Sequence, residues 1–191
     1  MAKLYFRYGA MNCGKSTAII QVAYNYQEKG KKILLMKPST DTKGEMNVQN
    51  RSGLYRKVDN LLLPDEKIRP YITTNIDAIL IDEAQFLTEN QVRELYEISK
   101  IDNIPVLCYG LRNDFQMNPF QGALYLLALS DDIEELKTIC SCGKKATQNL
   151  RKINNIPTFE GNQILIDGSN NEITYESVCG NCYIRIRNKY K

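Results

Sequence analysis

The segment from Gly9 to Ser16 constrains the fold of this chain more than any other. It reads Gly-Ala-Met-Asn-Cys-Gly-Lys-Ser and fits the pattern G-x-x-x-x-G-K-[ST] in full. Alternating apolar residues precede it at 4–8, and an apolar stripe at helical spacing follows it from Lys15 to Gly30. A glycine-rich turn between a strand and a helix directs consecutive backbone N–H groups at phosphate oxygens. The alternative, a chance match in a turn, does not explain the strand and helix on either side.

The whole motif is therefore predicted to bind the phosphates of a nucleotide. We expect the ammonium group of Lys15 to contact the β- and γ-phosphates and the hydroxyl of Ser16 to ligate Mg²⁺. The candidate nucleotide-binding residues of the motif are Gly9, Ala10, Met11, Asn12, Cys13, Gly14, Lys15 and Ser16.

Unbroken apolar runs predict further strands that are buried on both faces, as in a parallel sheet. These runs cover 33–36, 78–81 and 105–109. Thr88 and Gln91 form a capping box that opens a helix to about Asp102, and another helix is expected over 120–129. The polar residues 38–53 predict a loop. Alternating strands and helices predict an α/β fold of the P-loop NTPase (RecA-like) class, with helices on both faces of a parallel sheet.

An acidic pair directly follows the apolar run 78–81. In a P-loop protein, an acid at the end of a buried strand supplies the second contact to Mg²⁺, and Asp82 is the candidate. Glu83 comes next and is the candidate base that accepts a proton from a nucleophile attacking the γ-phosphate. Gln85 of the same segment is grouped with the nucleotide-binding residues. The alternative for either carboxylate alone is a helix cap or a surface charge.

The cysteines form two close pairs, Cys140 with Cys142 and Cys179 with Cys182. Four thiolates in two pairs match a tetrahedral, structural Zn²⁺ site with no open position for catalysis, although the first pair is one residue shorter than the usual C-x₂-C. The chain has no His to replace a thiolate. Unligated cysteines are the alternative. Short β-like pieces begin near Lys137, which predicts two domains, 1–136 and 137–191.

Composition excludes several classes of protein. Apolar residues make up 43% and charged residues 25% of the chain, which is typical of a globular protein. The net charge of +3 is too small to indicate a nucleic-acid or membrane partner. The longest apolar run, 123–129, is far shorter than the roughly 20 residues of a membrane-spanning helix, and the first residues lack the apolar core of a signal peptide. We therefore expect a cytoplasmic protein with reduced thiols.

Taken in order, the motifs resemble those of the type II thymidine kinases, P-loop kinases with a zinc-bearing lasso domain. The resemblance rests on the N-terminal loop motif and on four later segments: 82–86, 110–115, 138–147 and 175–183. It implies transfer of the ATP γ-phosphoryl group to the 5′-hydroxyl of thymidine, and of deoxyuridine as a further substrate, giving dTMP and ADP in nucleotide salvage. It also implies Mg²⁺ as the catalytic ion, Zn²⁺ as a structural ion and a homotetramer.

The resemblance also implies roles for individual residues. Glu83 matches the catalytic base, and Asp82 matches the carboxylate linked to Mg²⁺. The residues that match the walls of the nucleoside pocket are Phe86, Leu111, Phe115 and Phe120, and Tyr175 matches the lasso tyrosine that packs on the nucleoside. For each phenylalanine the alternative is packing in the core. Arg112 stands where the family commonly has Asp.

Two other functions are consistent with parts of the sequence. Asp-Glu-Ala-Gln at 82–85 is similar to helicase motifs, and zinc ribbons often bind nucleic acid, so a nucleic-acid motor is one alternative. A helicase normally needs two α/β domains, and 191 residues supply one. The other alternative is a zinc-ribbon scaffold that binds ATP without turnover, against which the adjacent Glu83 argues.

Overall fold

The computed structural model describes residues 1–40, 46–50, 53–64, 66–163 and 172–190. Its centre is a sheet of six parallel strands in the order β5-β2-β6-β7-β1-β8. The strands are β1 (Leu4–Tyr8), β2 (Ile33–Pro38), β5 (Asn60–Leu62), β6 (Ala78–Ile81), β7 (Val106–Gly110) and β8 (Asp132–Glu135).

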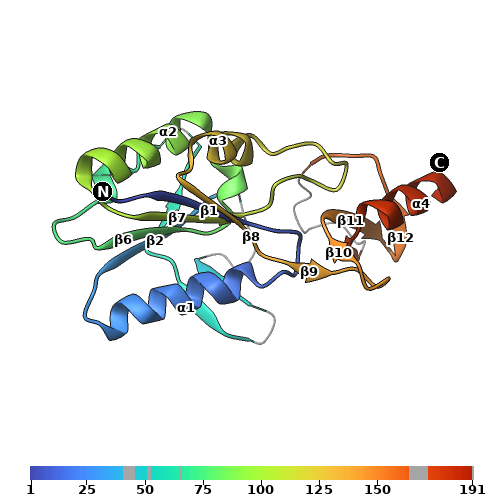
Figure 1. Cartoon of the computed structure of the whole chain (residues 1–191), viewed down its shortest axis with the longest axis horizontal. Helices are drawn as coiled ribbons and strands as arrows, with labels where there is room; N and C mark the ends of the chain where they lie inside the picture. Colours follow the sequence, from blue (N-terminus) through green and yellow to red (C-terminus); the bar gives the residue numbers. More distant parts are fainter. Residues whose placement is uncertain (41–45, 51–52, 65, 164–171, 191) are drawn as a thin grey trace.

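Helices cover both faces of this sheet (Figure 1). On one face lies α1 (Lys15–Glu28), together with the hairpin of β3 (Asn47–Gln49) and β4 (Tyr55–Lys57). On the other face lie α2 (Glu89–Glu97), continued by a π-helical turn (Ile98–Asp102), and α3 (Gln121–Leu129). The predicted α/β class with helices on both faces is confirmed.

The central strands are buried on both sides, and alternate residues face different helices. In β2, Leu34 and Met36 join the cluster under α2 and α3, whereas Leu35 packs in the cluster under α1. In β6, Ile79 joins the cluster under α2 and α3, and Leu80 joins the cluster under α1. This double burial explains why the sequence shows unbroken apolar runs rather than alternation.

After β8 the chain forms smaller sheets. The strands β9 (Thr138–Ile139) and β10 (Lys145–Ala146) pair with each other. A second sheet has the order β12-β11-β13, from β11 (Gln148–Ile153), β12 (Ile156–Thr158) and β13 (Ile173–Val178). The helix α4 (Gly180–Tyr190) follows. Residues of β10, β11, β13 and α4, among them Leu150 and Tyr183, form an apolar cluster that is separate from the two clusters of the large sheet.

Most predicted elements are present where local pattern indicated them. The capping box is confirmed, since the N–H of Gln91 donates to the hydroxyl of Thr88 and the Thr88 N–H donates to the Gln91 side chain. The prediction of a loop over 38–53 is wrong in part, because Asn47–Gln49 forms β3. Val48 of this strand is buried against α1, and one apolar residue among polar ones gave no detectable period. Residues 41–45 and 51–52 of that segment lie outside the described part.

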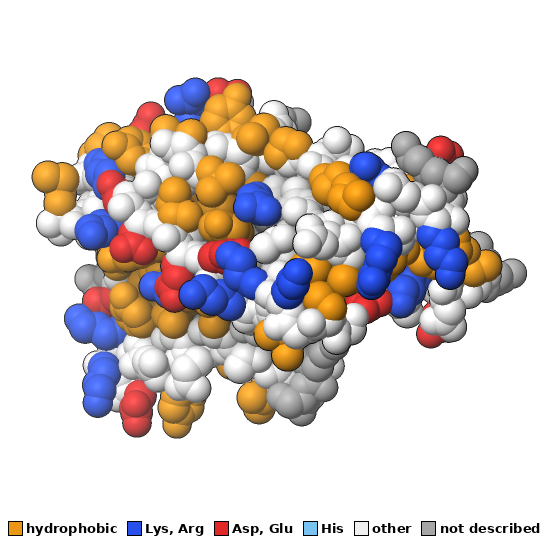
Figure 2. All heavy atoms as spheres, turned by 45° about the vertical axis from the view of Figure 1, so that its right-hand side comes forward, with side chains coloured by type: hydrophobic (Ala, Val, Ile, Leu, Met, Phe, Trp, Pro, Cys, Tyr) orange, Lys and Arg blue, Asp and Glu red, His pale blue; other side chains and the backbone are white. Residues whose placement is uncertain are grey.

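Surface properties agree with the composition. Within the described residues, no helix is long and apolar enough to cross a bilayer. Figure 2 shows a face on which Lys and Arg side chains are interspersed with acidic and apolar ones rather than forming one continuous basic patch.

Candidate active site

The segment Gly9–Ser16, called the nucleotide loop below, connects β1 to α1. It turns sharply at Asn12, with φ 65°, and at Gly14, with φ 89°. The side chain of Lys15 is only 8% exposed, and its Nζ donates to the carbonyl oxygen of Ala10 at 3.0 Å. The loop thus curls around its own lysine, at the N-terminus of a helix, which is the geometry that binds phosphate.

Gly9 has a steric role at the start of the loop. A Cβ atom there would lie 2.4 Å from the carbonyl oxygen of Leu136 and 2.5 Å from Sγ of Cys13. No side chain fits in that space, because Leu136 continues the pairing of β8 with β1 and its N–H donates to the Tyr8 carbonyl oxygen at 2.7 Å. The end of the large sheet therefore fixes the point where the nucleotide loop begins.

Asp82 lies at the same edge of the sheet as the nucleotide loop. It directly follows β6, and β7 is the one strand between β6 and β1. The Asp82 N–H donates to the carbonyl oxygen of Met36 at 3.0 Å, and the residue is 4% exposed. Parallel strands carry their carboxyl ends to one edge, so the carboxylate of Asp82 and the hydroxyl of Ser16 are suited as oxygen ligands for Mg²⁺ beside bound phosphates.

Glu83 has an unusual backbone conformation. Its φ of 49° lies in the left-handed region, which costs a residue other than glycine about 1–2 kcal/mol. The Nε2 group of Gln85 donates to Oε2 of Glu83 at 2.5 Å, and Oε1 of Gln85 accepts from the Leu111 N–H at 2.9 Å. Gln85, predicted to bind nucleotide, therefore uses both ends of its amide to tie the Glu83 carboxylate to the end of β7. Sequence pattern gave no sign of this link.

Two glycines allow the Ala84–Leu87 turn to sit close to its neighbours. A Cβ at Gly122 of α3 would lie 2.6 Å from the carbonyl oxygen of Ala84 and 2.8 Å from that of Leu87. A Cβ at Gly110 would lie 2.7 Å from Oε1 of Gln85. The turn that follows Glu83 therefore packs directly on α3 and on the end of β7, which fixes its position.

The residues predicted to wall a nucleoside pocket divide into two groups. The rings of Phe86 and Phe120 meet edge to face, with centroids 5.4 Å apart, and Leu111 packs against the same cluster. Phe115 lies apart from them and is 2% exposed, with its carbonyl oxygen accepting from the Tyr183 hydroxyl at 2.6 Å. Tyr175 lies on β13. The structure thus brings Phe86, Leu111 and Phe120 together and gives Phe115 a separate set of neighbours.

Arg151 lies beside one of the predicted pocket residues, and sequence pattern did not single it out. It is 1% exposed, and its guanidinium carbon lies 3.4 Å from the centroid of the Phe115 ring. The same guanidinium donates to the carbonyl oxygens of Glu160 and Asn162, each at 2.8 Å. On β11, Arg151 is the direct cross-strand partner of Tyr175. A buried cation therefore joins the ring of Phe115 to the backbone at residues 160 and 162, within the segment between the cysteine pairs.

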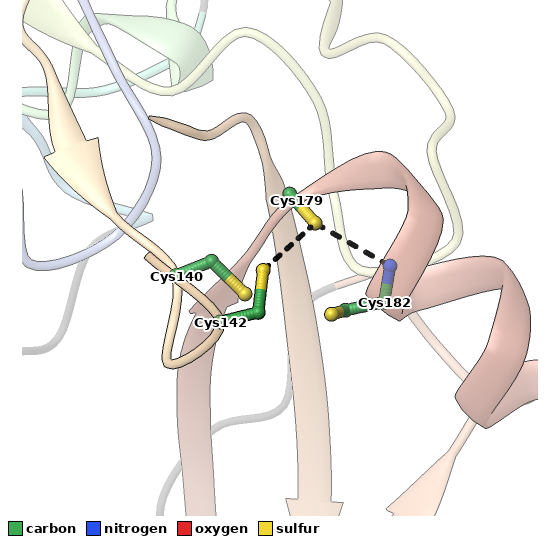
Figure 3. A group of neighbouring side chains, drawn as sticks. All are labelled: Cys140, Cys142, Cys179 and Cys182. Atoms are coloured by element: carbon green, nitrogen blue, oxygen red, sulfur yellow. Dashed lines mark hydrogen bonds between the residues drawn. The ribbon is translucent and has the colours of Figure 1, made fainter. Parts of the chain in front are cut away.

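The four cysteines form one cluster (Figure 3). Their sulfur atoms all lie within 4.8 Å of one another, with 3.6 Å between Sγ of Cys142 and Sγ of Cys179. The short first pair fits because a tight turn closes at Gly143, where φ is 83° and the N–H donates to the Cys140 carbonyl oxygen at 2.8 Å. Two sulfurs come from this turn and two from the start of α4, an arrangement that could hold a metal such as zinc.

Backbone N–H groups favour the ionised form of two of these thiols. Donation from the Cys142 N–H lowers the pKa of Cys140 to about 6, and donation from the Cys182 N–H, 3.4 Å from Sγ of Cys179, lowers the pKa of Cys179. Hydrogen bonds with Cys142 and Cys179 instead raise the pKa of Cys182 to about 12. Because thiolates are the ligands that bind zinc, Cys140 and Cys179 are the two thiols already favoured as ligands.

Comparisons with known proteins give one consistent family. A family model described as thymidine kinase matches residues 2–183. The chain is 45% identical over 187 residues to a thymidine kinase of Legionella pneumophila (strain Lens), covering 94% of this chain and 88% of the relative. It is 46% identical over 189 residues to a thymidine kinase of Streptococcus thermophilus (strain CNRZ 1066), covering 94% and 92%. It is 42% identical over 191 residues to a thymidine kinase of Chromobacterium violaceum, covering 96% and 98%.

The family match includes the nucleotide loop, the acidic pair and all four clustered cysteines, since each lies within residues 2–183. A similarity confined to the loop would have indicated only a P-loop NTPase, whereas this one extends over nearly the whole chain. The protein therefore belongs to the thymidine kinase family.

Proposed function

We propose that the protein is an ATP:thymidine 5′-phosphotransferase, which makes dTMP and ADP in nucleotide salvage and also accepts deoxyuridine. The observation that carries the proposal is the position of Glu83, directly after the buried Asp82 and hydrogen-bonded to Gln85, at the sheet edge that also bears the nucleotide loop. A scaffold that only binds ATP would not need a carboxylate held in a strained conformation at this place.

The nucleotide loop binds the phosphates in this proposal. Its backbone N–H groups and the ammonium group of Lys15 neutralise the β- and γ-phosphate oxygens. The hydroxyl of Ser16 and the carboxylate of Asp82 would hold Mg²⁺, which supplies further charge neutralisation when it is bound with ATP. The present contact of Lys15 with the Ala10 carbonyl oxygen keeps the ammonium group inside the loop before phosphate arrives.

Glu83 acts as the general base. Its carboxylate accepts the proton of the nucleoside 5′-hydroxyl as that oxygen attacks the γ-phosphorus, and the bond from the γ-phosphorus to the β,γ-bridging oxygen breaks to release ADP. The hydrogen bond from Gln85 restricts the rotamer of Glu83, so the base needs little reorganisation when substrate binds.

The nucleoside is proposed to bind between aromatic and apolar side chains. Flat rings favour stacking on a pyrimidine base. The proposed substrate-binding residues are Phe86, Leu111, Phe115, Phe120 and Tyr175. The edge-to-face contact of Phe86 with Phe120 and the packing of Phe115 on Arg151 give these rings fixed orientations.

The proposal also covers the metal, the division into domains, the oligomeric state and the location of the enzyme. The cysteine cluster holds a structural Zn²⁺, through Cys140, Cys142, Cys179 and Cys182. The chain divides into a P-loop kinase domain at 1–136 and a zinc-ribbon and lasso domain at 137–191. The enzyme is a homotetramer in the cytoplasm, without a nucleic-acid or membrane partner.

A phosphotransfer assay tests the function directly. The purified protein is given Mg²⁺-ATP and each of the four deoxynucleosides in turn, with deoxyuridine as a fifth acceptor, and the nucleotide products are separated. We expect phosphorylation of thymidine and deoxyuridine, with ADP formed only when an acceptor is present. ATP hydrolysis that is stimulated by DNA and indifferent to thymidine would instead identify a nucleic-acid motor. ATP binding without any turnover would identify a scaffold.

A further inference from the structure

The backbone of Met11, in the middle of the nucleotide loop, is bound at both of its polar atoms by residues far along the chain. Its N–H donates to Oδ1 of Asn149 at 2.8 Å. Its carbonyl oxygen accepts from the hydroxyl of Ser177. These contacts join residues 138 and 166 positions apart, so they connect the loop to the elements that follow the large sheet.

Asn149 and Ser177 act as a pair because they are direct cross-strand partners of β11 and β13. They are 3% and 9% exposed. The Asn149 side chain therefore accepts from the Met11 N–H, and the Ser177 hydroxyl donates to the Met11 carbonyl oxygen. Hydrogen bonds that are shielded from water are stronger than exposed ones, and breaking one leaves a buried group unsatisfied.

Asn149 is itself held by a third segment. Its Nδ2 donates to the carbonyl oxygen of Asn113 at 3.0 Å, and Nδ2 of Asn113 donates to Oε1 of Gln148 at 2.8 Å. This fixes which end of the Asn149 amide faces Met11, because the amide nitrogen is already engaged. The acceptor for the Met11 N–H is thereby oriented before any nucleotide binds.

We infer that Asn149 and Ser177 are positioning residues for the nucleotide loop, which they hold in its phosphate-binding conformation. The reason lies in the geometry of the peptide unit between Met11 and Asn12. In a planar trans peptide the C=O and N–H groups point in opposite directions. When Ser177 holds the Met11 carbonyl toward β13, the N–H of Asn12 is directed away from that strand, and the carbonyl cannot turn into the loop.

A carbonyl oxygen that turned into the loop would repel phosphate oxygens and remove one N–H donor from the site. The Asn149–Ser177 pair prevents that rotation from outside the loop, through the backbone of Met11. This inference rests on the proposed role of the loop in binding ATP, and not on which nucleoside receives the phosphate.

The test compares variants of Ser177 in the full-length protein. Ser177→Ala removes the donor to Met11, Ser177→Thr keeps a hydroxyl, and Lys152→Ala is the matched control. Lys152 lies on β11 and pairs with Glu176 of β13 at 2.6 Å, so its loss disturbs the same strand pair without reaching the loop. Asn149→Ala is a second variant that removes the other contact.

The first measurement is the Kd for Mg²⁺-ADP by calorimetry. We expect Ser177→Ala and Asn149→Ala each to raise it roughly five- to tenfold, the effect of one lost hydrogen bond. Ser177→Thr and Lys152→Ala are expected to stay within about twofold of the parent protein. The second measurement is amide hydrogen exchange without nucleotide, in which residues 9–14 should lose protection in Ser177→Ala and keep it in Lys152→Ala.

An unchanged Kd in both Ser177→Ala and Asn149→Ala would overturn the inference. So would an equal loss of affinity in Lys152→Ala, because the effect would then be a general loosening of the strand pair. Failure of the proposed function is detected separately, by the absence of thymidine phosphorylation in the parent protein. ADP binding and loop protection can be measured in either case.

Discussion

Gln85 donates a hydrogen bond of 2.5 Å to the carboxylate of Glu83 while accepting one from the backbone N–H of Leu111, the residue that follows β7. One neutral side chain thus fixes the orientation of the residue proposed as the general base.

The first prediction concerns Glu83 itself. Glu83→Gln keeps the shape of the side chain but removes the proton acceptor, so kcat should fall by about 10²–10⁴-fold. The Kd for Mg²⁺-ADP should stay within about twofold, since the nucleotide loop is untouched. Steady-state kinetics and calorimetry provide the two values. Glu97→Gln, on the exposed face of α2, is the matched control. A kcat near that of the parent enzyme would remove Glu83 from the mechanism.

The second prediction separates the orienting role of Gln85 from a role in nucleotide binding. Gln85→Ala leaves the Leu111 N–H without its acceptor and frees Glu83 to rotate. We expect kcat to fall by roughly ten- to a hundredfold, as positioned general bases lose part of their effect. We also expect the free energy of unfolding to fall by about 1–3 kcal/mol. A large rise in the Kd for ADP with little change in kcat would show that Gln85 contributes to nucleotide binding and not to the orientation of Glu83.

The third prediction concerns the close approach of α3 at Gly122. A Cβ atom there would lie 2.6 Å from the Ala84 carbonyl oxygen, so Gly122→Ala must displace the turn below Glu83. We expect the free energy of unfolding to fall by about 1–3 kcal/mol. Gly180→Ala is the control, because a Cβ at Gly180 meets nothing within 4 Å. Equal thermal unfolding midpoints for the two variants would contradict the packing argument.

The fourth prediction concerns the reactivity of Cys13. Its side chain is partly exposed in the nucleotide loop, and the Lys15 ammonium group lies 3.6 Å from its sulfur. Burial raises the pKa of Cys108 far above the ordinary range, so that thiol should resist alkylation. Iodoacetamide followed by peptide mass spectrometry should modify Cys13 and not Cys108, and Mg²⁺-ATP should slow the modification of Cys13. An equal rate of Cys13 modification with and without Mg²⁺-ATP would place Cys13 outside the phosphate site.

The fifth prediction concerns the metal. Protein purified without chelators should contain about one Zn²⁺ per chain, held by the cysteine cluster. Cys179→Ser should lose the ion and expose the elements after β8 to protease, while the large sheet keeps its own cores. Elemental analysis measures the metal. Cys13→Ser, a cysteine outside the cluster, should retain it. Metal-free parent protein would refute the proposal.

Local sequence patterns predicted the main elements because their causes are local. The apolar runs of β2, β6 and β7 and the Thr88 capping box each depend on neighbouring residues. β8 was not predicted, since its residues Asp-Ile-Glu-Glu show neither alternation nor an apolar run. It forms because its backbone pairs with β1 in parallel register, which no local pattern encodes.

The same distinction between local patterns and long-range contacts applies to the candidate site. The nucleotide loop, the acidic pair and the cysteine pairs could be found because their chemistry requires fixed spacings. Sequence pattern could not identify Asn149 and Ser177, because their partner Met11 is more than a hundred residues away. It could not identify Arg151, because the contact of this residue with the Phe115 ring exists only after folding.

Ser177, which holds the Met11 carbonyl oxygen, lies two residues before Cys179, so one short stretch of chain reaches both the nucleotide loop and the cysteine cluster. When one ligand orders an element that a second site also uses, the two ligands are thermodynamically linked, and each changes the affinity of the other by the same factor. If the thiols hold zinc and bound nucleotide further orders this stretch, nucleotide at the loop would raise the affinity of the cluster for the ion, and loss of the ion would weaken ATP binding while the large sheet stayed folded. The phosphorylation of nucleosides would then depend on the zinc supply of the cell.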